Sequence, residues 1–62
     1  MSTQSPKATL DQFKQQCETT KTQLSGQLNQ IPDPQARTAV QMAINAVDHC
    51  IAQCHTATGA VQ

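Results

Sequence analysis

The chain has 62 residues, a formal net charge of +0, and charged residues at only 13% of its positions. Its hydrophobic fraction of 37% is rich in alanine, and only ten residues are large aliphatic or aromatic side chains. This composition predicts one small domain with a thin core. Four basic residues against four acidic ones exclude a strong electrostatic surface for nucleic acid, so we expect no nucleic-acid partner.

The sequence also argues against membrane insertion and export. No apolar run approaches the roughly 18 residues that a membrane-spanning helix needs. The segment 1–7 lacks the apolar centre of a signal peptide. We therefore expect a cytoplasmic location without membrane association, and a single domain over residues 1–62 with frayed ends at 1–5 and 60–62.

The first predicted element is a helix over residues 6–30. Ser5 is a suitable N-cap and Pro6 a suitable first helical residue, and Thr9 with Gln12 forms a second capping pattern. Gly26 lies inside this helix, where we expect a kink or the close approach of another backbone. Spacings of three and four predict one apolar face, formed by Leu10, Phe13, Cys17, Thr20, Leu24, Leu28 and Ile31.

A second helix is predicted over residues 34–58. The two prolines around Asp33 end the first helix near Gln30, with Asp33 as the next N-cap and Pro34 as the first helical residue. Gly59 is expected to stop the helix. The predicted stripe comprises Val40, Ile44, Val47, Ile51, Cys54 and Val61, with Ala36, Ala43 and Cys50 beside it. The short loop makes the two helices antiparallel neighbours.

This all-α hairpin has too little core to stand alone, which predicts a homodimer. Two helices hide only their line of contact, and pairing two hairpins into a four-helix bundle would cover the remaining apolar flank. Charges of alternating sign predict a solvated, self-paired edge to the first helix. They are Lys7, Asp11, Lys14, Glu18 and Lys21.

Three cysteines are predicted to share one level of the hairpin. If the chain folds about residue 33, Cys17 faces Cys50, and Cys54 lies one helical turn further on. His49 and His55 flank them. Four interpretations remain open: small core side chains, a Cu(I) or Zn(II) site made by these five residues, a Cys17–Cys50 disulfide, and covalent haem.

Two stretches resemble known families. The segment 49–54, His-Cys-Ile-Ala-Gln-Cys, is similar to the CxxxC helices of four-helix-bundle copper-binding proteins, a resemblance that implies Cu(I) bound by inward-facing thiols. The segment 50–55 resembles the c-type haem attachment motif with one residue added.

The hairpin architecture, with Leu28-Asn29-Gln30-Ile31 before the turn, is similar to the dimeric repressor-of-primer proteins that regulate plasmid copy number. That resemblance implies RNA binding, for which Phe13, Lys14 and Lys21 are the candidate residues.

Catalysis is not expected from this sequence. Cysteine and histidine lie on one helix, and a two-helix chain has little room to enclose a substrate. We expect a non-enzymatic binding or interaction module that acts as a homodimer with a protein partner. The alternatives are a thiolate metal-binding protein using Cys17, Cys50 and Cys54, and a small RNA-binding regulator.

Overall fold

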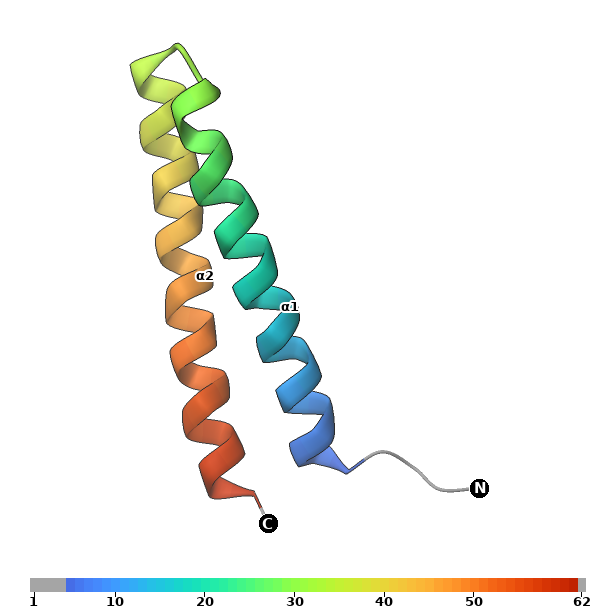
Figure 1. Cartoon of the computed structure of the whole chain (residues 1–62). Helices are drawn as coiled ribbons and strands as arrows, with labels where there is room; N and C mark the ends of the chain where they lie inside the picture. The colour runs from blue at the N-terminus through green and yellow to red at the C-terminus, as the bar shows by residue number, and fades with distance from the viewer. Residues whose placement is uncertain (1–4, 62) are drawn as a thin grey trace.

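The structure, a computed structural model that describes residues 5–61, is a two-helix hairpin (Figure 1). Helix α1 spans Pro6–Gln27, a 3-10 turn η1 spans Leu28–Gln30, and helix α2 spans Pro34–Ala60. The chain reverses at the turn, so that the start of α1 and the end of α2 lie at the same end of the molecule. The predicted antiparallel all-α hairpin is confirmed, and the described residues contain no strand.

Both helices begin at the caps expected from the sequence. The Ala8 amide donates a hydrogen bond of 3.1 Å to the Ser5 hydroxyl, and the Ala36 amide donates one of 3.0 Å to the Asp33 carboxylate. Each bond satisfies an amide that has no partner within its helix. The capping pattern at Thr9 is not used, because its hydroxyl donates to the Ser5 carbonyl instead.

The helix ends differ from the prediction in detail. The last turn before the loop is the tighter η1, so helical backbone does reach Gln30 as expected. Gly59 does not stop α2, which continues to Ala60 and is capped at Val61. Gly59 keeps a negative φ, and the Val61 amide donates to the Ala57 carbonyl, so the helical bonding simply continues past the glycine. Fraying was expected at residues 1–5 and 60–62, of which 1–4 and 62 lie outside the described residues. Of the others, Ser5 caps α1, Ala60 is helical and Val61 caps α2.

The face of α1 that meets α2 differs from the predicted one. Phe13 is 46% exposed and Thr20 is exposed, so neither belongs to the buried side. Lys14 and Lys21 take their places as half-buried residues. The long aliphatic stem of a lysine can cover such a seam while its ammonium group stays near water. The observed seam of α1 is Leu10, Lys14, Cys17, Lys21, Leu24, Leu28 and Ile31.

The core is very thin. Among residues 5–61 only Ile44 and Cys54 are buried, and both lie on α2. The other predicted stripe residues of α2 are half-buried, whereas Ala43 is exposed. The hairpin is long and flat, with extents of 49 × 22 × 13 Å. Most apolar side chains therefore have one covered side and one side open to solvent.

Candidate functional site

The three cysteines do meet at one level of the hairpin, as predicted. Cys17 and Cys50 are half-buried on facing helices, Cys54 is buried, and all three are free thiols. Burial is the main cause that raises the pKa of the Cys17 thiol. The Cys50 thiol raises that pKa further through charge repulsion and a side-chain hydrogen bond, and Cys54 adds repulsion.

Cys54 has a similar environment. Burial again is the main cause that raises the pKa of this thiol, followed by charge repulsion from Cys50 and a hydrogen bond with it. Lys14 has a smaller, opposite effect because its positive charge stabilises the thiolate. Cys50 therefore acts on both of the other thiols, and the pKa of each is raised above that of an ordinary cysteine.

The two histidines do not complete a ligand set with these thiols. His49 is exposed, and its Nε2 lies 3.1 Å from the Nε2 of Gln53, one turn further along α2. His55 is also exposed. Six residues separate the two in sequence, which turns their side chains about 120° apart around the helix. Within residues 5–61, no three His, Cys, Asp or Glu side chains are arranged to hold one metal ion.

One ion pair links the two helices beside the cysteines. The Lys21 ammonium lies 2.6 Å from the Asp48 carboxylate, and it is the one salt bridge between described residues. The alternating charges of α1 were expected to pair with each other, but the observed pair instead crosses to α2. It fixes Lys21 and Asp48 on the same side of the hairpin.

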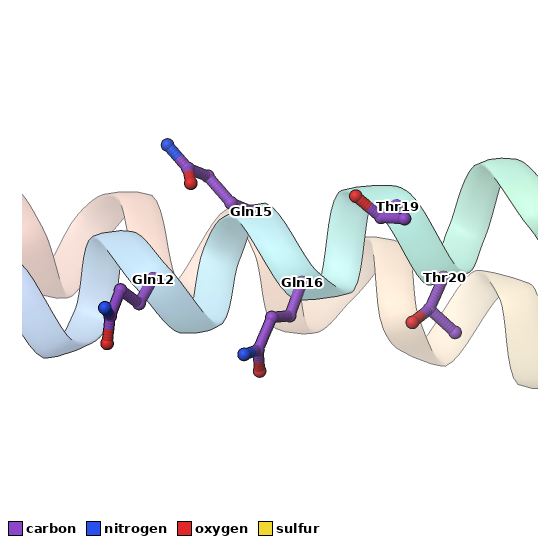
Figure 2. Close-up of a pocket in the computed structure, with 5 residues that line it drawn as sticks. All are labelled: Gln12, Gln15, Gln16, Thr19 and Thr20. Carbon is purple, nitrogen blue, oxygen red and sulfur yellow. The ribbon is translucent and has the colours of Figure 1, made fainter.

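The surface hollows are open to solvent, and two of them have no charged residue in their lining. One of about 660 Å³ lies on α1 alone and is lined by amides and hydroxyls. Figure 2 shows Gln12, Gln16 and Thr20 pointing to one side of the helix and Gln15 pointing away from them. A second hollow, of about 190 Å³, spans both helices and is lined by Phe13, Gln16, Cys17, Thr20 and Val47.

The candidate RNA-binding residues are not gathered together. Phe13 is exposed beside the hollow between the helices, whereas Lys21 is held by Asp48. Phe13 and Lys14 are adjacent in sequence and so point about 100° apart around α1. Sequence reasoning missed one exposed apolar residue, Met42, which is 66% exposed. Its position outside the heptad stripe of α2 was the available signal.

No protein-family model matches the chain, and no curated protein or solved structure is significantly similar to it. Neither helix within the described residues is sufficiently long and apolar to cross a membrane.

Proposed function

We propose that this hairpin is a non-enzymatic interaction module that works as a homodimer, with four helices in an antiparallel bundle. The observation that carries the proposal is the thin core: Ile44 and Cys54 are the two buried residues between Ser5 and Val61. A folded chain normally hides far more apolar surface than this. A second hairpin would cover the half-exposed seam.

The energetic reason is simple. Each further 100 Å² of apolar surface removed from water contributes about 2.5 kcal/mol. The chain-ordering cost of about 1–2 kcal/mol per residue has to be met by such burial. Phe13 and the half-buried aliphatic side chains of both helices still expose apolar surface that a second chain could cover. Association is the route by which small helical hairpins obtain a sufficient core.

The chemistry of the side chains supports binding rather than catalysis. Reactive cysteines have a lowered pKa, because the thiolate is the nucleophile. Here burial raises the pKa of Cys17 and Cys54. Three free thiols also suit a reducing compartment such as the cytoplasm, where we place the protein.

Sedimentation equilibrium under reducing conditions tests the homodimer. We expect the mass of two chains at micromolar concentrations, and the single-chain mass only on strong dilution. A chain that stays monomeric and unfolds cooperatively at every accessible concentration would rule the proposal out.

A second candidate function is thiolate binding of Cu(I) or Zn(II). The observation that favours it is the position of Cys50, which interacts with both Cys17 and Cys54. An ion would have to draw the three thiols together by side-chain rotation, since they are not in a ligating arrangement. Soft thiolates are the preferred ligands of Cu(I) and bind Zn(II) as well.

Competition with a chromophoric chelator tests metal binding. If the thiols form a site, the reduced chain takes up Cu(I) or Zn(II) stoichiometrically, and the triple variant Cys17→Ser, Cys50→Ser, Cys54→Ser does not. His49→Gln and His55→Gln serve as matched controls, because both histidines are exposed. Equal uptake by the wild type and the triple variant would eliminate this candidate.

A gel shift at low salt tests RNA binding, where we expect no shift.

A further inference from the structure

The charged side chains of the two helices lie on one side of the hairpin. Those of α1 recur at steps of four and three residues, which places them in one strip along the helix. Arg37 and Asp48 on α2 are eleven residues apart, close to three full turns, and so also share a strip. The contact of 2.6 Å between Lys21 and Asp48 joins the two strips. This charged face consists of Lys7, Asp11, Lys14, Glu18, Lys21, Arg37 and Asp48.

Within the two helices α1 and α2, the opposite side carries no charged side chain. Phe13, Gln16 and Thr20 recur at steps of three and four on the other flank of α1, and Cys50 faces that flank from α2. The hollow of about 190 Å³ that Phe13, Gln16, Cys17, Thr20 and Val47 line confirms that this flank runs across both helices. We call it the uncharged face and define it by Phe13, Gln16, Thr20, Ala43, Ala46 and Cys50.

We propose that the uncharged face is the docking surface for a second copy of this chain, related by a two-fold axis. The proposal rests on the proposed homodimer and assigns the surface through which it forms. Burying this face desolvates no charged group, whereas burying the charged face would remove seven of them from water. A two-fold axis pairs each surface with itself, so an uncharged surface meets another uncharged surface.

The chemistry of the face fits that occupant better than a charged one. A nucleic acid, an acidic peptide or a basic peptide would find no opposite charge on it, and so would gain no electrostatic attraction. Phe13 provides an aromatic side chain that is 46% exposed and lines the hollow between the helices. The hydroxyl of Thr20 and the amide of Gln16 can pair with the same groups of the second copy.

The available area is sufficient. A stable complex buries about 800 Å² of each partner. The hairpin exposes 4754 Å², of which such a footprint is about one sixth. Its broad sides measure 49 by 22 Å, so one flat side provides the required area. Ala43 and Ala46 are exposed and small, which permits helix axes to approach to about 8–10 Å.

A pair of matched charge substitutions on α2 tests the assignment. Ala46→Glu places a carboxylate on the uncharged face, and Ala52→Glu places the same carboxylate on the other side of the same helix. Both alanines are exposed, so helix formation should be equally affected. We expect Ala46→Glu to raise the dimer dissociation constant at least ~30-fold, as for a central interface residue, and Ala52→Glu to leave it within ~2-fold.

A second pair of substitutions, on α1, tests the same face in case the α2 variants fail to fold. Thr20→Glu lies on the uncharged face and Thr22→Glu does not, and both threonines are exposed. Sedimentation equilibrium gives the dissociation constants, and far-ultraviolet circular dichroism at high concentration reports helix content. The same contrast is expected in this pair.

The outcomes separate the two proposals. A monomeric wild type would overturn both the homodimer and its docking face. If the wild type is a dimer, but Ala52→Glu and Thr22→Glu weaken it as strongly as Ala46→Glu and Thr20→Glu do, the docking face is wrong. The homodimer itself would then still stand.

Discussion

Cys17 and Cys54 show how a thin core affects titration. Burial is the main cause that raises the pKa of both thiols above the ordinary value of 9.0, and the Cys50 thiol raises it further. The folded state therefore prefers the protonated thiols more strongly than the unfolded state does. Folding stability from these groups is fully present below pH 9 and is lost as the pH rises through the folded-state pKa.

We therefore expect the free energy of unfolding to fall between neutral pH and strongly alkaline pH. Urea titrations over that range measure the loss. In the double variant Cys17→Ala, Cys54→Ala the alkaline slope should become shallower. A slope unchanged in the variant would show that other groups control the alkaline transition.

Alkylation of the two thiols should likewise be slow at neutral pH and accelerate with rising pH.

The meeting of the thiols was predictable because it depends only on where the chain reverses. A turn near residue 33 brings Cys17 opposite Cys50, and the four-residue step to Cys54 is fixed by the helix. The role of Phe13 was not predictable in the same way. Leu10 and Cys17 are seven residues apart, and either Phe13 or Lys14 can fill the position between them. In the structure Lys14 fills it, on the side where Lys21 contacts Asp48, and a contact between the helices cannot be read from the spacing within α1.

At the scale of single elements, the two helix starts were the most predictable feature. Ser5 and Asp33 each combine a capping oxygen with a following proline, and both caps form. The helix ends were less predictable, because a glycine stops a helix only if it adopts the left-handed conformation. Neither glycine has a positive φ.

Gly26 offers a direct test at the level of α1. A Cβ added there meets no atom within 4 Å, and the residue is helical with a negative φ. The expected close approach of another backbone is therefore absent from the described chain. Gly26→Ala should raise the free energy of unfolding by about 0.5–1 kcal/mol, since glycine in a helix loses more conformational freedom on folding.

Urea denaturation measures this gain, with Gly59→Ala as the comparison. Gly59 also has open space around it, but it lies in the final turn of α2, where we expect a smaller gain. A destabilised Gly26→Ala chain would indicate that a partner backbone occupies the space in the assembled protein.

At the scale of the whole molecule, a hairpin that folds through association has a concentration-dependent stability. Unfolding of a dimer releases two chains, so mass action raises the Tm as concentration increases. We expect Tm to rise steadily over a hundred-fold increase in concentration, measured by circular dichroism under reducing conditions. In the Ala46→Glu variant the Tm should be lower than that of the wild type at every concentration, because its dimer is weaker. A constant Tm in the wild type would contradict obligate dimerisation.

The side on which Lys21 and Asp48 meet has a consequence for the ionic strength of the solution. Salt screens exposed ion pairs, and this pair lies within one copy with its two side chains 39% and 60% exposed. The surface assigned to the second copy carries no ion that salt could screen. Sodium chloride should therefore slightly weaken the Lys21–Asp48 ion pair between the two helices of one chain. The affinity between two copies should stay constant or increase. Ionic strength thus separates the forces that shape the hairpin from those that join two of them.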